Sequence, residues 1–327
     1  MASKTKVLLF GAGAVGTIYV YLLQRAGCDV TAVCRSNYDA ARANGFHIDS
    51  KKYGNGIHIQ PRVVQTPQEA ERDDFDYVIV SAKAFPGNEP STASLLRPVV
   101  GKTTAIVLIQ NGIGIEEEYR QMYPQNCILS CVVYLPTTQT SPGHVNMGDI
   151  EWLEIGTYPA SSDKSERQQA DVLKDLLIAG GGTAEVFDDI QPKRWSKLLV
   201  NAPWNPICAL TRCRDVAFMA SSPVAKQYVK DVMMEVVHVA QAVGYAEINE
   251  EMAEMQLGRA TARIGTKGVE PSMMADALNG RRMEVEAIVG NVVRMGQEKG
   301  LAVPKLEGLY VLLKALDASM AAARGEP

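Results

Sequence analysis

The sequence predicts a two-domain protein in which an α/β domain precedes an all-helical domain. Short apolar strands alternate with helical segments as far as residue 190, and beyond that point the strand pattern vanishes. A chain of 327 residues is long enough for two domains with substantial cores. The polar stretch 188–192 is the expected boundary, which gives domains over residues 1–190 and 191–327.

The first strand, which begins near Lys6, runs directly into a G-x-G-x-x-G turn and then into a helix expected over 17–26. Glycines at the three motif positions permit a tight reversal, close approach of the backbone to a pyrophosphate, and close packing of helix on strand. Free N–H groups at the helix N-terminus then attract the anion. The turn Gly11-Ala12-Gly13-Ala14-Val15-Gly16 therefore predicts a Rossmann-type dinucleotide-binding domain; the alternative is a purely structural turn.

The end of the second strand, expected over 29–34, bears on the choice of dinucleotide. An NAD site usually carries Asp or Glu there, whereas this chain has Cys34-Arg35-Ser36-Asn37. A guanidinium is always charged and can make a two-pronged contact, so Arg35 suits a 2′-phosphate. We therefore favour NADP(H) as the cofactor; the alternative is that Arg35 is an ordinary solvated loop charge.

The rest of the first domain reads as alternating strands and helices. We expect a helix over 38–44 and then a hairpin over 46–64, inserted into the doubly wound sheet and broken by Asn55-Gly56. Buried parallel strands follow over 75–81 and 105–110, and further, partly antiparallel strands over 128–133, 143–145 and 152–156. The domain then continues with a polar loop over 159–166, a helix over 167–179 and a strand over 183–187. The carboxyl ends of parallel strands line the ligand crevice, so Lys83 and Asn111 should face the ligands.

The second domain contains a polar cluster in an otherwise apolar helical stretch. Lys197, Asn201 and Asn205 are spaced i, i+4, i+8, which places them on one helical face, or along a groove if Pro203 and Pro206 break the helix. The alternative is an amphipathic helix with a snorkelling lysine. Helices are expected over 193–202, 206–210, 224–243 as the central core helix, 250–261, 272–280, 284–299 and 306–323.

Composition excludes several classes of function. A net charge of −4 without basic runs argues against nucleic acid as a partner. The six cysteines form no C-x-x-C pair and the four histidines no zinc pattern, so we expect reduced thiols and no metal. No apolar run is long enough for a membrane span and the first strand leaves no room for a signal peptide, which predicts a cytoplasmic protein. The long apolar helices allow a monomer or a homodimer.

Together these motifs resemble the ketopantoate reductase (2-dehydropantoate 2-reductase) family over nearly the whole chain. The similar segments are the glycine turn, Arg35, Ser81-Ala82-Lys83-Ala84, Gln110-Asn111-Gly112-Ile113-Gly114, 197–206, Ser272-Met273-Met274-Ala275-Asp276 and Arg282-Met283-Glu284. The resemblance implies a Rossmann domain, a helical domain and a cleft in which NADPH reduces a 2-oxo acid to the D-2-hydroxy acid.

The resemblance also implies a role for each matching residue. Lys197 would be the general acid at the 2-oxo group, with Glu284 beside it. Asn111 would lie at the nicotinamide and also bind the substrate. Asn201 and Asn205 would bind the substrate hydroxyl and Ser272 its carboxylate, while Lys83 and Arg35 would lie near the cofactor. Desolvation lowers the pKa of a lysine and a nearby carboxylate raises it, so Lys197 and Glu284 could give and regain a proton. The alternative for Glu284 is a surface ion pair with Arg281 or Arg282.

Two departures from the family pattern concern the substrate. Ala275 stands where Gln is common and Trp204 where smaller aliphatic residues are common. The leading hypothesis is reduction of 2-dehydropantoate to D-pantoate in pantothenate biosynthesis. The alternatives are a D-2-hydroxyacid dehydrogenase or ketoreductase acting on another branched or aromatic 2-oxo acid, and a non-catalytic NADP(H)-binding sensor, which would not need a proton donor.

Overall fold

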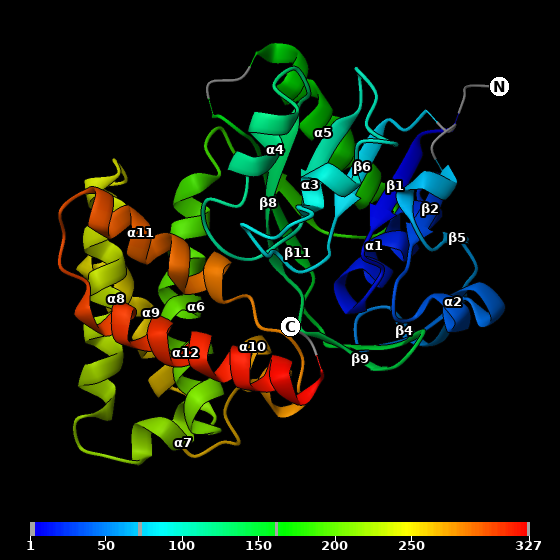
Figure 1. Ribbon diagram of the computed structural model, residues 1–327. Coiled ribbons are helices and arrows are strands. Elements are labelled where there is room, and N and C mark those ends of the chain that lie inside the picture. Colours follow the sequence, from blue (N-terminus) through cyan, green and yellow to red (C-terminus); the bar gives the residue numbers. More distant parts are fainter. Residues whose placement is uncertain (1–3, 71–73, 161–162, 326–327) are drawn as a thin grey trace. The chain divides into compact units, whose positions relative to one another are not determined.

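The computed structural model describes residues 4–70, 74–160 and 163–325, and the chain forms two compact units (Figure 1). One unit comprises Met1–Asn111 and Ile115–Ile190, and the other comprises Gly112–Gly114 and Gln191–Pro327. The division therefore falls at residue 190 with one exception: Gly112–Gly114 packs with the helical unit although it follows a strand of the first unit.

An eight-stranded sheet forms the centre of the first unit, in the order β12-β11-β8-β7-β6-β1-β2-β5. All neighbouring strands are parallel except β8 and β11, which are antiparallel. The chain order reverses direction between β1 and β6, which is where doubly wound sheets bind ligands. The predicted Rossmann-type fold is confirmed. The strands are β1 (Lys6–Phe10), β2 (Asp29–Val33), β5 (Arg62–Val64), β6 (Tyr77–Val80), β7 (Ala105–Leu108), β8 (Ile128–Tyr134), β11 (Trp152–Thr157) and β12 (Ala184–Val186).

A second sheet, which the sequence did not predict, contains four strands in the order β4-β3-β10-β9. They are β3 (Phe46–Ser50), β4 (Gly54–Ile59), β9 (Thr137–Ser141) and β10 (His144–Met147). The predictions that the hairpin over 46–64 is inserted into the main sheet and that 143–145 extends it are wrong; only β5 joins the main sheet. Burial alternates along β10, as is typical of a sheet with one solvated face, whereas β6 and β7 are buried throughout. Asn55-Gly56 lies inside β4 rather than at the turn.

Two helices of the first unit, α1 and α5, begin earlier than the sequence predicts. Helix α1 starts inside the glycine motif, and α5 starts at Lys164 because the Asp163 carboxylate accepts hydrogen bonds from the amides of Ser165 and Glu166, at 2.9 and 3.0 Å. The helices are α1 (Ala14–Arg25), α2 (Tyr38–Asn44), the 3₁₀ turn η1 (Pro67–Ala70), α3 (Thr92–Leu95), α4 (Glu117–Met122) and α5 (Lys164–Ala179). Helix α2 matches its prediction; residues 161 and 162 of the predicted polar loop lie outside the described residues.

The second unit is built from helices and their connecting loops, with no strand among its described residues. It contains α6 (Gln191–Thr211), α7 (Asp215–Ala220), α8 (Ala225–Ala242), α9 (Glu250–Thr261), α10 (Ser272–Leu278), the π-helical turn η2 (Glu286–Gly290), α11 (Asn291–Glu298) and α12 (Pro304–Ala323). Val229, Val232 and Val236 of α8 are fully buried, which confirms α8 as a core helix. Helix α7 was not predicted.

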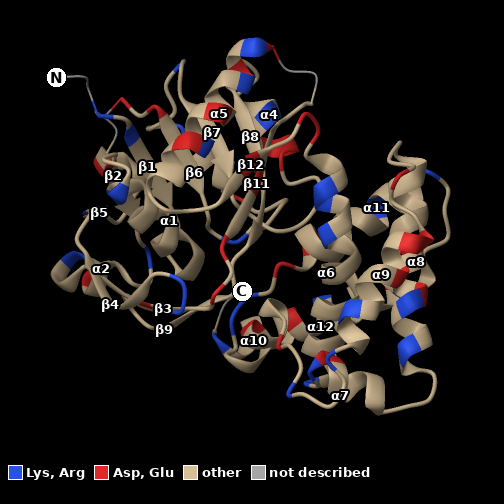
Figure 2. Ribbon diagram, turned by 180° about the vertical axis from the view of Figure 1, so that it is seen from behind, with Lys and Arg blue, Asp and Glu red and all other residues tan. Residues whose placement is uncertain are grey.

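Lys and Arg residues alternate with Asp and Glu residues along the ribbon of each unit (Figure 2). None of the helices in the described part of the chain combines the length and the apolar character needed to cross a bilayer.

His47 stacks between His58 and His144 across the second sheet, with ring centroids 4.7 Å apart in both pairs. Within residues 4–70, 74–160 and 163–325, no group of three or more His, Cys, Asp and Glu side chains is arranged to hold a metal ion.

Candidate functional site

The glycine turn between β1 and α1 owes its shape to two close contacts with the segment after β6. Gly11 has a φ of +96°, and a Cβ there would lie 2.4 Å from the backbone nitrogen of Ala82. A Cβ on Gly16 would lie 2.5 Å from Ser81 Oγ. Since real side chains do not approach so closely, only glycine allows the turn to pack here.

Gly13 differs from Gly11 and Gly16 because the space that a Cβ would occupy there is open. It adopts an extended conformation before α1, and the nearest atom to a Cβ there would be Gln139 Oε1 at 3.8 Å. Gly13 is the N-cap residue of α1 and has no side chain that could cap the first turn. The turn therefore combines space next to the backbone with helix-terminal N–H groups, and both features fit a pyrophosphate.

Three polar side chains hold the carbonyl groups of these segments. Asn37 Nδ2 donates to Ala12 O at 2.7 Å, Ser81 Oγ donates to Gly11 O at 3.0 Å, and Gln110 Nε2 donates to the carbonyl of Ala82 at 2.7 Å. They fix the turn before any ligand arrives. None of the three was predicted as a site residue; the signal that could have found them is a polar residue within a few positions of a strand's carboxyl end.

The predicted cofactor-selecting segment after β2 carries one positive charge. Arg35 and Ser36 are exposed, while Cys34 is buried and burial raises the pKa of its thiol to about 12. Cys34 is therefore neutral at physiological pH. Lys83 and Asn111 follow β6 and β7, as predicted, and both are half-buried. The assignment of Arg35 to a 2′-phosphate stays a prediction.

Helix α6 continues without a break through Pro203 and Pro206. Proline usually interrupts a helix because it lacks an N–H and crowds the preceding turn. Of the two arrangements that the spacing allows, the structure has the single helical face: Lys197, Asn201 and Asn205 lie along one face of a continuous helix, and the expected end of a helix at residue 202 is wrong.

Asn205 joins this face to the start of α10. Its Oδ1 accepts hydrogen bonds from the amide of Met273 at 3.0 Å and from Ser272 Oγ at 3.2 Å. The N-cap residue of α10, Pro271, offers no side-chain acceptor, so Asn205 supplies one from another helix. The structure thus brings together Asn205 and Ser272, two of the predicted substrate-binding residues.

Glu284 lies just before the helical segment that contains the π-turn. It is half-buried, and its carbonyl accepts a hydrogen bond from the amide of Ile288 at 3.1 Å. Arg281, one of the two alternative partners of Glu284, pairs instead with Asp276, with Nε 3.1 Å from Oδ1. The catalytic pairing of Glu284 with Lys197 stays a prediction.

The chain matches two family models. Residues 7–160 match the model described as ketopantoate reductase PanE/ApbA, and residues 189–317 match the model of the C-terminal part of the same family. The 2-dehydropantoate 2-reductase of Nostoc sp. is 29% identical over 318 residues, which are 96% of this chain and 96% of the relative.

Solved structures show the same similarity. The crystal structure of 2-dehydropantoate 2-reductase from Methylococcus capsulatus has a TM-score of 0.83 and 29% identity, over 97% of this chain and 98% of its own. The ternary structure of D-mandelate dehydrogenase with NADH and anilino(oxo)acetate has a TM-score of 0.84 at 23% identity, over 97% of this chain and 99% of its own, so it is similar in fold.

Proposed function

Because the chain belongs to the ketopantoate reductase family of oxidoreductases, we propose that it reduces 2-dehydropantoate to D-pantoate with NADPH, a step of pantothenate biosynthesis. The observation that carries this proposal is the polar face of α6. Lys197, Asn201 and Asn205 share that face, and Asn205 is bonded to Ser272. A proton donor and several hydrogen-bonding groups in one row are what reduction of a polar 2-oxo acid needs.

In this proposal the first unit binds the cofactor. The N–H groups of the turn Gly11-Ala12-Gly13-Ala14-Val15-Gly16 hold the pyrophosphate, Arg35 pairs with the 2′-phosphate, and Lys83 and Asn111 lie closer to the nicotinamide. The bound nicotinamide supplies the hydride. Preorganisation of the turn by Asn37 and Ser81 supports this assignment.

Lys197 supplies the proton. Its ammonium group donates a hydrogen bond to the 2-oxo oxygen and transfers the proton as negative charge develops there. Glu284 favours the charged form of the lysine and so helps it to regain a proton. Asn201 and the Nδ2 group of Asn205 bind the substrate hydroxyl, since Asn205 Oδ1 is already engaged with α10.

Ser272 can reach the substrate carboxylate only by turning its hydroxyl. A serine has one hydroxyl hydrogen, and in the structure it points to Asn205 Oδ1 over 3.2 Å, a weak hydrogen bond. When a carboxylate binds, this hydrogen turns to the anion, and Asn205 Oδ1 keeps its bond from the Met273 amide. The charge-assisted bond is the stronger one.

A second candidate function is reduction of a bulkier branched or aromatic 2-oxo acid. Ala275 lies one helical turn after Ser272 in α10 and is half-buried, so a small side chain stands where the family often has glutamine. Trp204 is 3% exposed and belongs to the apolar core, so it would act on substrate choice only through packing. A smaller side chain at this position would admit a larger acid beside Ser272. A non-catalytic sensor would not need the polar face of α6.

The test follows the absorbance of NADPH while the purified protein is offered 2-dehydropantoate, 2-oxoisovalerate or phenylglyoxylate in turn. Fastest turnover of 2-dehydropantoate supports the leading proposal. Preference for another acid supports the second candidate. Tight NADPH binding without oxidation by any of the three acids would contradict both and favour a sensor.

A further inference from the structure

The segment Gly112–Gly114 is held by backbone and side-chain hydrogen bonds of the helical unit. The Ile113 amide donates to Ala287 O at 3.1 Å, and Asn291 Nδ2 donates to Ile113 O at 2.6 Å. Arg194 Nη1 donates to Gly112 O at 2.9 Å. Gly112 has a φ of +104°, and a Cβ there would lie 2.4 Å from Ala287 O, so the segment rests directly on the π-turn.

Asn291 is one of two side chains that hold this segment, and hydrogen bonds at both ends of its amide fix its orientation. Asn291 is 9% exposed and stands at the start of α11. Its Oδ1 accepts a hydrogen bond from Arg294 Nη2, which leaves Nδ2 for Ile113 O. An amide with both ends engaged cannot flip without losing both bonds. Arg294 therefore reinforces the orientation in which Nδ2 of Asn291 faces Ile113 O.

Arg294 is held in turn by Glu286 of the π-turn. Arg294 Nη1 lies 2.7 Å from Glu286 Oε2, and Glu286 Oε1 accepts hydrogen bonds from Tyr310 Oη at 2.9 Å and Lys314 Nζ at 3.0 Å. Burial alone would raise the pKa of Glu286, but the hydrogen bonds from Arg294, Lys314 and Tyr310 outweigh it and hold the pKa below its ordinary value. The carboxylate is therefore charged at neutral pH and keeps Arg294 in place.

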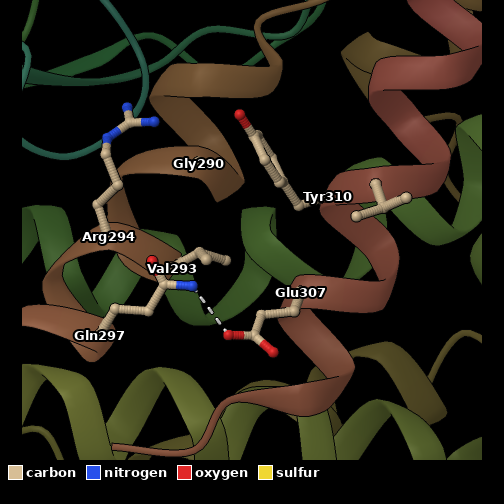
Figure 3. Close-up of a pocket in the computed structure, with 7 residues that line it drawn as sticks. Gly290, Val293, Arg294, Gln297, Glu307 and Tyr310 are labelled. Atoms are coloured by element: carbon tan, nitrogen blue, oxygen red, sulfur yellow. Dashed lines mark hydrogen bonds between the residues drawn. The ribbon is translucent and has the colours of Figure 1, made fainter. Parts of the chain in front are cut away.

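Part of this network lines a surface pocket of ≈ 500 Å³ between α11 and α12. Figure 3 shows Arg294 and Gln297 of α11 on one side, with Tyr310 and Glu307 of α12 on the other. Gln297 Nε2 donates to Glu307 Oε1 at 3.0 Å. This bond joins the same two helices without touching Asn291, so it provides a matched control.

We propose that Asn291 is a positioning residue for the reaction, and that Arg294 and Glu286 act through it. The proposal rests on the proposed function, in which Asn111, the residue directly before the segment, lies at the nicotinamide. Misplacement of a reacting group by about 1 Å can lower turnover by about 100-fold. Cofactor affinity comes mainly from the phosphate-binding turn. Loss of the Asn291 bond should therefore lower kcat far more than it weakens NADPH binding.

The test compares Asn291→Ala and Arg294→Gln with the control Gln297→Ala, all in the full-length chain. Hydrogen–deuterium exchange of residues 112–115 reports on the segment whether or not a substrate is known. We expect faster exchange and roughly 10- to 100-fold lower kcat in Asn291→Ala, and a smaller loss in Arg294→Gln. Gln297→Ala should leave the exchange of residues 112–115 and kcat unchanged. All three variants should keep the NADPH Kd within about threefold of the wild-type value.

The outcomes separate the two proposals. Unchanged exchange in Asn291→Ala, or a kcat within about twofold of wild type, overturns the positioning role. A parallel loss of kcat and melting temperature in Asn291→Ala, Arg294→Gln and Gln297→Ala also overturns it, because that pattern indicates general destabilisation. If the wild-type protein reduces no 2-oxo acid, the proposed function fails, and the exchange data alone decide whether Asn291 orders the segment.

Discussion

Lys197 stands on a helix that cannot readily turn or slide. Its neighbours Leu198 and Leu199 are 2% and 0% exposed and belong to the apolar core of the helical unit. Rotation of α6 would expose these side chains at a cost of about 1.5–3 kcal/mol each. The core therefore fixes the direction in which the half-buried lysine projects, which is what a general acid requires.

Replacing Lys197 with alanine should remove the proton donor of the proposed reaction and leave the cofactor site intact. We expect Lys197→Ala to lower turnover by roughly two or more orders of magnitude, with NADPH binding preserved. Steady-state kinetics and a fluorescence titration with NADPH check this. A variant with near-native turnover would rule out Lys197 as the general acid.

Arg35 should decide between the two nicotinamide cofactors. A charge-assisted hydrogen bond contributes about 1.5–3 kcal/mol, so Arg35→Ala should weaken NADPH binding by roughly 10- to 100-fold and change NADH binding little. Titration of both cofactors measures the difference. The control is Arg42→Ala, because Arg42 is an exposed arginine of α2 bonded to Tyr38 Oη at 3.0 Å. Equal losses for NADPH and NADH in Arg35→Ala would contradict the role.

The junction of α6 and α10 links fold and function at the scale of elements. Helix α10 is short, spanning Ser272–Leu278. Its first turn is capped by the side chain of Asn205, which stands 68 positions before Met273 in the chain. Asn201, one turn before Asn205, makes no side-chain hydrogen bond to another residue in the described part of the chain. The two asparagines share a helical face, yet only Asn205 supports the fold.

This difference gives a paired prediction. Asn205→Ala leaves the Met273 amide without its acceptor and should lower the free energy of unfolding by about 1–3 kcal/mol as well as raising KM for the 2-oxo acid. Asn201→Ala should raise KM with little change in stability. Urea unfolding and steady-state kinetics of both variants provide the comparison. Equal stability of the two variants would show that the Asn205 cap contributes little.

At the scale of the whole molecule, the charged network around Glu286 predicts how stability depends on pH. The pKa of the Glu286 carboxyl group is lower in the folded state than its ordinary value, because hydrogen bonds from Arg294, Lys314 and Tyr310 outweigh the effect of burial. A group with a depressed folded pKa contributes stability above its unfolded pKa, and this contribution is lost as the pH falls through the folded pKa. The protein should therefore lose stability on acidification below about pH 4.3.

The measurement is the urea midpoint of the wild-type protein and of Glu286→Gln from neutral to acidic pH. Glutamine cannot ionise, so the midpoint of the variant should fall less steeply over this range, and the two proteins should differ most at neutral pH. Parallel curves would show that Glu286 is not a source of the acid sensitivity. Gln297→Ala removes a neutral hydrogen-bond donor that joins α11 to α12. Its urea midpoint should depend on pH in the same way as that of the wild-type protein.

The sequence by itself determined the features that are encoded within a few neighbouring residues. Apolar periodicity predicted most strands and helices, and the glycine spacing predicted the turn after β1, since each depends on local backbone geometry. The spacing of Lys197, Asn201 and Asn205 predicted one helical face. The roles of these residues came from resemblance to the ketopantoate reductase family.

Only the tertiary structure decided which elements pair and what their polar groups bond. It placed β3 and β10 in a second sheet, because strand pairing depends on partners far along the chain. It also assigned Gly112–Gly114 to the helical unit through Asn291, a contact between residues 178 positions apart. A local pattern states which face of an element is apolar, but the partner of that face is chosen by packing of the whole chain.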